Sequence, residues 1–236
     1  MSRTALLGIV DSLARTIHDL KWEPGPTLWS EYVGECNYSA PAQDDKKRIV
    51  FEFLDLAARQ RQLSMVWDLG ANVGEYSRMA ATRSGHVVSF DLDQAVVERH
   101  FRACAASADR KVLPLVQDLG NPSAPIGWHH AERRSILERG PADATLALAL
   151  VHHLAIGGNV PLGHVAAFLR DASRYLIVEF VPKEDSQVRR MLAVREDIFP
   201  DYTRPGFEEA FSRYFVLVKS QQIAGTVRTM YLMERR

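Results

Sequence analysis

Residues 64–93 constrain the fold most, because they combine a strand, a glycine turn, a helix and a second strand. The apolar run 66–67 leads into the turn 70–74 (Gly-Ala-Asn-Val-Gly), where two residues without side chains allow a tight turn and a close approach to a ligand. A helix is expected over 75–83, and the next apolar run stops at Asp91. An acid at the end of a second parallel strand can accept hydrogen bonds from two ribose hydroxyls. This segment therefore predicts half of a nucleoside-binding site.

The rest of the chain continues the alternation of strand and helix patterns, which favours a doubly wound α/β sheet. The run 145–150 has almost no polar residues, as expected for a strand covered by helices on both faces. Right-handed crossovers bring the ends of parallel strands to one edge of the sheet, so Asp68, Asp91, Asp118 and His152 should converge there. The further strands are expected at 112–116, 175–180, 215–219 and 227–233, and the further helices at 160–172 and 183–195.

Three motifs in order carry a family resemblance: 68–74 (Asp-Leu-Gly-Ala-Asn-Val-Gly), 91–93 (Asp-Leu-Asp) and 117–119 (Gln-Asp-Leu). This series resembles that of the class I S-adenosylmethionine-dependent methyltransferases, over roughly residues 60–236. It departs from the three-glycine dinucleotide fingerprint, because the third residue of the turn is Asn72. The resemblance implies a Rossmann-like sheet of seven strands, mostly parallel with one antiparallel strand near the C-terminus. It also implies S-adenosylmethionine as the cofactor.

The resemblance assigns roles to the motif acids. Asp91 would hold the ribose hydroxyls, Asp68 would orient the methionine ammonium or cap the turn, and Asp118 would accept from the adenine amino group or belong to a surface turn. Asp93 is expected to cap the helix that begins near residue 94. The expected cofactor-binding residues are Asp68, Gly70, Asn72, Gly74, Asp91, Leu92, Asp118, Leu119 and Ala149.

Two adjacent histidines, His152 and His153, follow the fourth strand and are the candidate catalytic residues. A histidine near the sulfonium could take a proton from a hydroxyl, an amine or an acidic carbon. Adjacent residues leaving a strand point to different sides, so one of the two could instead be structural. This ending differs from the Asn-Pro-Pro-Tyr type and resembles the branch of the superfamily that acts on small molecules. No metal site is expected, because neighbouring histidines rarely chelate one ion and no cluster completes them.

The N-terminal part, residues 1–60, is expected to form a helical arm or lid on a catalytic domain at 61–236. It contains an amphipathic helix at 4–20 and a helix over about 44–60. Its aromatic residues could cover a cationic sulfonium or fasten the arm to the domain. The expected substrate or lid residues are Trp29, Tyr32, Tyr38, Glu179 and Tyr202. Within the superfamily, the chain most resembles a bacterial, nodulation-type group of small-molecule methyltransferases.

Composition limits the partners. Basic and acidic residues both number 29, and no long basic face suggests nucleic acid. The chain has no membrane-length apolar run and no secretory segment, so a cytoplasmic enzyme is expected, with Cys36 and Cys104 as free thiols. The expected reaction is methyl transfer to a small molecule by in-line displacement. Two alternatives stay open: another use of the cofactor that releases methylthioadenosine, by aminocarboxypropyl transfer or cyclisation, and an inactive cofactor-binding scaffold. Acceptor, methylated atom and oligomeric state stay open too.

Overall fold

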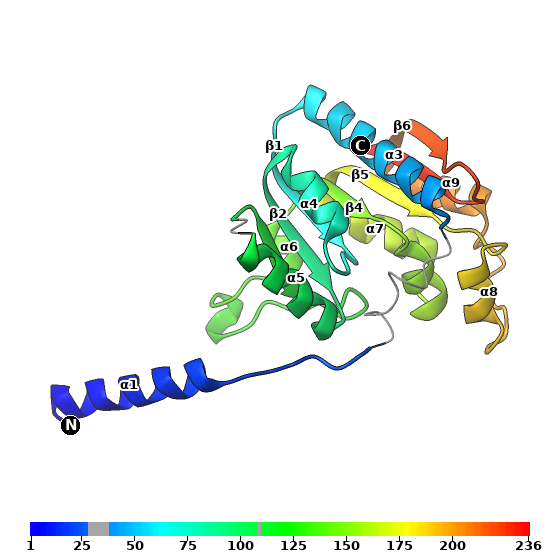
Figure 1. Cartoon of the computed structure of the whole chain (residues 1–236). Helices are drawn as coiled ribbons and strands as arrows, with labels where there is room; N and C mark the ends of the chain where they lie inside the picture. Colours follow the sequence, from blue (N-terminus) through cyan, green and yellow to red (C-terminus); the bar gives the residue numbers. More distant parts are fainter. Residues whose placement is uncertain (28–37, 108–109) are drawn as a thin grey trace.

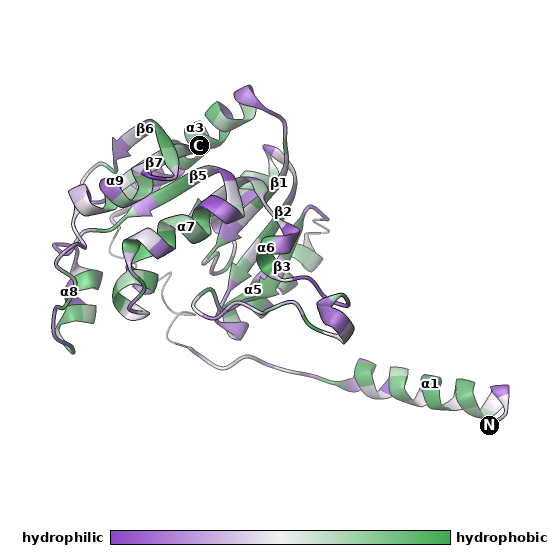
Figure 2. Cartoon of the chain, turned by 180° about the vertical axis from the view of Figure 1, so that it is seen from behind, coloured by the Kyte–Doolittle hydropathy of each residue, from purple (hydrophilic) through white to green (hydrophobic). Residues whose placement is uncertain are grey.

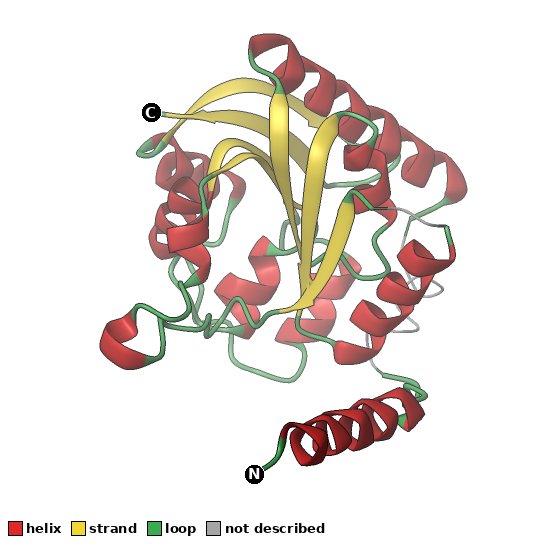
Figure 3. Cartoon of the chain, turned by 90° about the vertical axis from the view of Figure 1, so that its left-hand side faces the viewer, coloured by secondary structure: helices red, strands yellow, loops and turns green. Residues whose placement is uncertain are grey.

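The computed structural model describes residues 1–27, 38–107 and 110–236. Seven strands form one sheet in the order β3-β2-β1-β4-β5-β7-β6 (Figures 1 and 3). β7 is antiparallel to both of its neighbours, and the other pairs are parallel, which confirms the expected sheet with one antiparallel strand near the C-terminus. The strands are β1 Leu63–Leu69, β2 Ser84–Asp91, β3 Val112–Val116, β4 Ala142–Ala147, β5 Ser173–Phe180, β6 Phe215–Gln222 and β7 Thr229–Arg235.

Helices cover both faces of the sheet and give the protein two apolar cores. Val66 points into one core and its neighbour Trp67 into the other, as the alternation of side chains along a strand requires. The first core lies under α3 Ala40–Gln60, α4 Glu75–Ala81 and α5 Gln94–Ala106. The second lies under α6 Ile136–Arg139, α7 Leu162–Ala172 and α9 Arg204–Ser212, with Val188 of α8 Ser186–Leu192.

Side-chain caps mark where several helices begin. The Asp93 carboxylate accepts a hydrogen bond from the backbone N–H of Ala95 at 2.8 Å, which confirms the predicted cap of α5. Thr203 caps α9 in the same way by accepting from the N–H of Gly206 at 3.2 Å. Because Asp93 follows the acid Asp91 by two residues, its cap fixes the start of α5 close to the end of β2.

The fourth strand is shorter than its sequence pattern indicated. β4 ends at Ala147, and the apolar residues that follow leave the sheet, with Ala149 at a positive φ of 50°. The chain then makes a π-helical turn, η2 His153–Gly157. An apolar run alone cannot distinguish a buried strand from a buried loop. Two other expected elements have shifted bounds: the helix expected at 44–60 begins at Ala40, and the helix expected at 183–195 is the shorter α8. The segment 120–130 is irregular apart from one 3-10 turn, η1 Trp128–His130.

The first helix, α1 Arg3–Asp19, lies apart from the rest of the protein and buries none of its residues (Figure 1). The chain that follows it contacts α5, where Arg102 donates to the Glu23 carboxylate at 3.0 Å and to the carbonyl oxygen of Trp22 at 2.5 Å. α3, by contrast, packs its apolar face against the sheet. Within the described ranges, none of the helices combines the length and apolarity needed to traverse a bilayer.

Candidate functional site

The glycine turn after β1 folds back onto the end of β2. The N–H groups of Gly70 and Ala71 both donate to the carbonyl oxygen of Phe90, at 2.8 and 3.0 Å. Gly70, Asn72 and Gly74 have positive φ values of 75°, 48° and 76°. Such conformations are readily adopted by glycine and tolerated by asparagine. The glycine and asparagine residues of the turn therefore permit the shape that carries the backbone across the carboxyl edge of the sheet.

Asp91 joins this turn to the end of β2. Its Oδ2 accepts from the N–H of Asn72 at 2.8 Å, and its Oδ1 accepts from the N–H of Asp93 at 2.9 Å. Burial raises the pKa of Asp91, and these backbone donors oppose that rise. A carboxylate has about four acceptor positions, and the backbone N–H groups of Asn72, Leu92 and Asp93 bind Asp91, so it keeps acceptor capacity for a ligand hydroxyl.

Asp68, near the end of β1, is a second buried acid at this edge. Its Oδ2 accepts from the hydroxyl of Ser77, in α4, at 2.6 Å. Burial raises the pKa of Asp68 to about 6, although the hydrogen bond from Ser77 and the charge of Lys46 act in the opposite direction. A buried carboxylate whose donor in the described part of the chain is the neutral hydroxyl of Ser77 is suited to receiving a cation.

Two pockets meet at Gly70. One, of about 310 Å³, is lined among others by Tyr38, Lys46, Asp68, Gly70, Asn72, Tyr76 and Ala149. The other, of about 250 Å³, is lined among others by Gly70, Asp91, Leu92, Asp118, Leu119, Leu150 and His153. Because Gly70 borders both, an elongated ligand could lie across the turn with one end at Asp118 and the other at Asp68. Cavities of a few hundred Å³ are the usual size of small-molecule sites.

No family model matches this chain. It is 38% identical over 237 residues to the nodulation protein NoeA of Rhizobium meliloti (strain 1021); the match covers 100% of this chain and 49% of NoeA, so the chain spans about half of that relative. Among solved structures, magnesium protoporphyrin IX methyltransferase (ChlM) from Synechocystis PCC 6803 with bound SAH superposes with a TM-score of 0.56 at 15% identity, over 91% of this chain and 90% of ChlM.

Two further solved structures give similar superpositions. The N-methyltransferase NodS from Bradyrhizobium japonicum WM9 has a TM-score of 0.54 at 11% identity, covering 84% of this chain and 98% of NodS. The bifunctional kinase-methyltransferase WbdD has a TM-score of 0.55 at 18% identity, covering 94% of this chain and 46% of WbdD. The chain has the methyltransferase fold. Its seven-stranded sheet, with β7 antiparallel to both neighbours, is the sheet that the sequence resemblance implied.

In this methyltransferase fold, most of the predicted cofactor residues line the two pockets. Asp118 also accepts from the N–H of Gly120 at 2.7 Å, so it is both a turn residue and part of the pocket wall. Gly74 lies behind the turn rather than in either pocket wall. Trp29 and Tyr32 lie outside the described residues. The predicted residues that the structure brings to the pockets are Tyr38, Asp68, Gly70, Asn72, Asp91, Leu92, Asp118, Leu119, Ala149 and His153.

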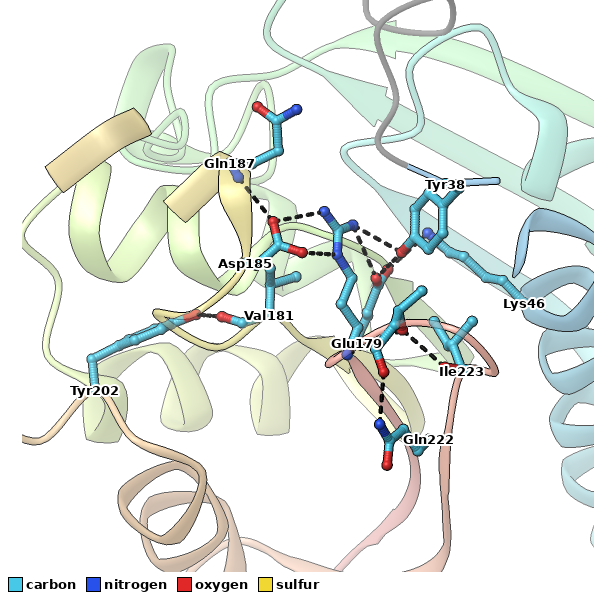
Figure 4. A network of polar contacts seen from close by, with 11 residues as sticks. Tyr38, Lys46, Glu179, Val181, Asp185, Gln187, Tyr202, Gln222 and Ile223 are labelled. Atoms are coloured by element: carbon cyan, nitrogen blue, oxygen red, sulfur yellow. Dashed lines mark hydrogen bonds and ion pairs between the residues drawn. The ribbon is translucent and has the colours of Figure 1, made fainter. Parts of the chain in front are cut away.

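Glu179 is fully buried at the centre of a charged network (Figure 4). Its Oε2 lies 2.7 Å from the Lys46 ammonium, and its Oε1 receives Arg228 at 3.3 Å and the hydroxyl of Tyr38. Arg228 also binds Asp185 through two hydrogen bonds of 2.7 and 3.0 Å. Burial acts to raise the pKa of Glu179, but the charges of Lys46 and Arg228 hold it below its usual value.

This network reaches the first pocket through Lys46 and Tyr38. The Lys46 ammonium lies 4.9 Å from the ring centre of Tyr38 and 5.0 Å from that of Tyr76. Sequence analysis missed Lys46, Arg228 and Asp185. One signal was available for Lys46, which occupies a position on the apolar face of α3 between Ala42 and Ile49. Charged residues are almost never fully buried unless they are paired.

The two histidines occupy different surroundings. His153 lines the second pocket, and burial followed by the charge of Arg228 lowers its pKa to about 4. His152 is fully buried, and its ring centre lies 4.1 Å from that of His153. Burial, then His153, Arg228 and Lys46, lower the pKa of His152 well below 6.5. Neither ring nitrogen of His152 has a hydrogen-bond partner in the described part of the chain. Both imidazoles are therefore uncharged at neutral pH.

Tyr202 lies away from Gly70 and its two pockets. Its hydroxyl donates to the carbonyl oxygen of Val181 at 2.9 Å, and its ring packs against Phe180 with ring centres 5.3 Å apart. It borders a separate pocket formed by residues 159–162 and 198–201. Its assignment to the substrate site stays a prediction. Across the described residues, no group of three or more histidines, cysteines or acids is placed to hold a metal ion.

Proposed function

We propose that this protein binds S-adenosylmethionine across the two pockets and transfers its methyl group to a small-molecule acceptor. The observation that carries the proposal is the meeting of both pockets at Gly70, with Asp91 in one and Asp68 in the other. In this arrangement the adenine lies beside Asp118 and Leu119, and the ribose hydroxyls donate to Asp91. The methionine ammonium then faces Asp68, whose carboxylate accepts from the hydroxyl of Ser77.

The chemistry asks little covalent work of the protein. The bound sulfonium supplies an electrophilic methyl group, and the acceptor displaces it directly. The chain must hold the reactants in line and exclude water from the reacting centre. The glycine turn and the buried acids provide the first requirement. The aromatic rings of Tyr38 and Tyr76 at the first pocket provide apolar walls and can face a cation.

The histidines are the proposed route for any proton that leaves the acceptor. A neutral imidazole can accept a proton, whereas an imidazolium cannot. His153 borders the second pocket, which holds Asp91 and Asp118. The ring of His152 packs against the ring of His153, and the ring nitrogens of His152 have no hydrogen-bond partner in the described part of the chain. A buried polar atom without a partner is destabilising by about 1–3 kcal/mol. His152 is fully buried and lines neither pocket, so His153 is the histidine that a ligand in the second pocket can reach directly.

A small acceptor is supported by charge and by the names of the similar proteins. Equal numbers of acidic and basic residues do not favour binding to a polyanion. ChlM is named for a porphyrin, and NodS is named an N-methyltransferase. The similar protein NoeA is about twice as long as this chain, so the proposal does not extend to an activity that needs the whole of NoeA.

Calorimetric titration tests cofactor binding. S-adenosylhomocysteine should bind the unmodified protein, and Asp91→Asn should weaken binding by about 1–3 kcal/mol because a ribose hydroxyl loses a charged acceptor. Asp171→Asn, at a partly exposed position of α7 where Asp171 pairs with Arg170, is the matched control and should bind as the unmodified protein does. Absence of binding to the unmodified protein would contradict the proposal.

Analysis of the sulfur product tests the reaction. Incubation with S-adenosylmethionine and a panel of amine, hydroxyl and carbon-acid acceptors should release S-adenosylhomocysteine. Release of methylthioadenosine instead would show that the aminocarboxypropyl chain is transferred or cyclised. Binding without either product would leave a cofactor-binding scaffold.

A further inference from the structure

α1 carries an apolar stripe that nothing in the described protein covers (Figure 2). The helix has 17 residues and buries none of them. Its apolar residues remain exposed, from 49% at Leu6 to 67% at Ile17. An isolated helix of this length is marginally stable in water, because most helical stability comes from the packing of an apolar face. α1 therefore lacks the contact that its sequence is built to make.

The stripe follows a heptad repeat. Within α1, Leu6, Val10, Leu13 and Ile17 are separated alternately by four and three residues, which is the spacing of a coiled-coil seam. This register places the β-branched residues Val10 and Ile17 at position a and Leu6 and Leu13 at position d. The opposite face is polar and carries Asp11, Ser12, Arg15, His18 and Asp19.

We propose that α1 pairs with α1 of a second copy of this chain in a parallel, two-stranded coiled coil. The seam residues indicate this partner, because β-branched side chains at position a with leucine at position d favour parallel dimers over larger bundles. Leu7 and Ile9 flank the seam at positions e and g and widen the apolar contact at the amino end.

The attachment of α1 to the protein suits this pairing. Residues 22–27 are held along α5 by the contacts of Arg102 with Glu23 and Trp22 and by the hydrogen bond of Thr27 to Asp93. α1 extends away from the sheet from this anchor (Figures 1 and 2). The seam therefore lies clear of the α/β unit of its own chain.

The polar face argues against a lipid surface as the occupant. Helices that lie on membranes are rich in Lys and Arg on that face. Here Arg15 is paired with Asp11 at 2.5 Å, and Asp19 adds a second acid. The charges of the face therefore largely cancel.

Sedimentation equilibrium of the full chain tests the pairing. The unmodified protein should approach twice its monomer mass of 26.6 kDa as concentration rises. Leu13→Asp places a charge in the seam and should leave a monomer at every concentration. Ser12→Asp, on the polar face of the same helix, should dimerise like the unmodified protein. Because α1 buries no residue, both variants should keep the thermal unfolding of the α/β unit unchanged.

Cysteine crosslinking tests the orientation. Ser2→Cys places a thiol at the amino end of α1, where a parallel pair brings two copies together and an antiparallel pair separates them by about 25 Å. Oxidation should crosslink Ser2→Cys strongly and the unmodified protein, with its native cysteines only, far less. A monomer at all concentrations, a dimer that persists in Leu13→Asp, a trimer, or binding to phosphatidylserine vesicles that Leu13→Asp abolishes would each overturn the proposal.

Discussion

The imidazole of His100, in α5, lies directly against Gly74 at the start of α4. A Cβ built on Gly74 would stand 1.9 Å from both Cε1 and Nε2 of His100, far inside contact distance. Ser89 in β2 supports the ring from the other side, with its hydroxyl 3.3 Å from Nδ1. The glycine turn therefore rests on a buried side chain that belongs to the next helix. Its shape depends on that contact as well as on glycine's freedom at positive φ.

Substitution of Gly74 by alanine should weaken cofactor binding and stability together. The left-handed conformation alone disfavours alanine by about 1–2 kcal/mol, and the clash with His100 adds to it. We expect Gly74→Ala to lower the melting temperature and to weaken S-adenosylhomocysteine binding by tenfold or more. Calorimetry and thermal unfolding measure the two effects.

A double-mutant cycle separates clash from strain. His100→Ala removes the obstructing ring, so Gly74→Ala combined with His100→Ala should lose less than the sum of the single variants. The left-handed strain at position 74 remains in the double variant. Strict additivity would show that the ring does not limit position 74.

The glycine turn after β1 and the acid at the end of β2 were predictable because their geometry depends on residues that are close in the sequence. Gly70, Asn72 and Asp91 lie within one strand-turn-helix-strand unit, where period and glycine position determine geometry. The same reasoning predicted the cap of α5 by Asp93. The placement of the strand-end loops at one edge of the sheet was predicted from the handedness of the crossovers.

The remaining features depend on contacts between distant parts of the chain. Lys46 and Arg228 meet at Glu179 although 182 residues separate them in the sequence, and no local pattern predicts such a pairing. His100 likewise gains its role only when α5 packs beside the turn. The end of β4 was misplaced because Leu148 and Leu150 are apolar for a different reason, since they border the two pockets.

The ionised carboxylate of Asp68 should lower the free energy of unfolding at neutral pH, although cofactor binding needs it. Burial raises its pKa from 3.8 to about 6, so the folded protein binds the proton more tightly than the unfolded chain does. The stabilisation from this proton is complete below about pH 4 and is lost as pH rises through 6, a change of about 3 kcal/mol. At pH 7, Asp68→Asn should therefore have a higher free energy of unfolding than the unmodified protein. At pH 4 this advantage should be much smaller, because Asp68 itself is then protonated in the folded protein. Urea unfolding at both pH values tests this, with Asp171→Asn as the control.

The same acid should make cofactor affinity depend on pH. A bound ammonium favours ionised Asp68, so below pH 6 binding must displace a proton. Affinity for S-adenosylhomocysteine should then fall by up to about tenfold per pH unit. Methylthioadenosine lacks the ammonium group and should not show this fall. Equal pH profiles for the two ligands would place the ammonium elsewhere.

Removal of the Glu179 charge should destabilise the protein strongly. Glu179→Gln leaves Lys46 without a carboxylate in a buried site, and breaking a buried ion pair costs about 3–5 kcal/mol. Arg228 keeps Asp185 as a partner, so Lys46→Gln combined with Glu179→Gln should lose less than the two single variants together. Glu52→Gln, which loses surface pairs with Lys219 and Arg48, should cost at most about 1 kcal/mol. Similar urea midpoints for Glu179→Gln and Glu52→Gln would contradict the buried network.

The two histidines should stay uncharged well below neutral pH. Burial lowers the pKa of His153 to about 4 and that of His152 further below its usual value, and the charge of Arg228 adds to both effects. Nitrogen-15 spectra of the imidazoles, assigned with His152→Asn and His153→Asn, should keep neutral-type shifts from pH 8 down to about 5. A ring that is cationic at pH 7 could not accept a proton from the acceptor. Such a result would remove that histidine from the proposed proton route, while cofactor binding to Asp91 and Asp68 would be unaffected.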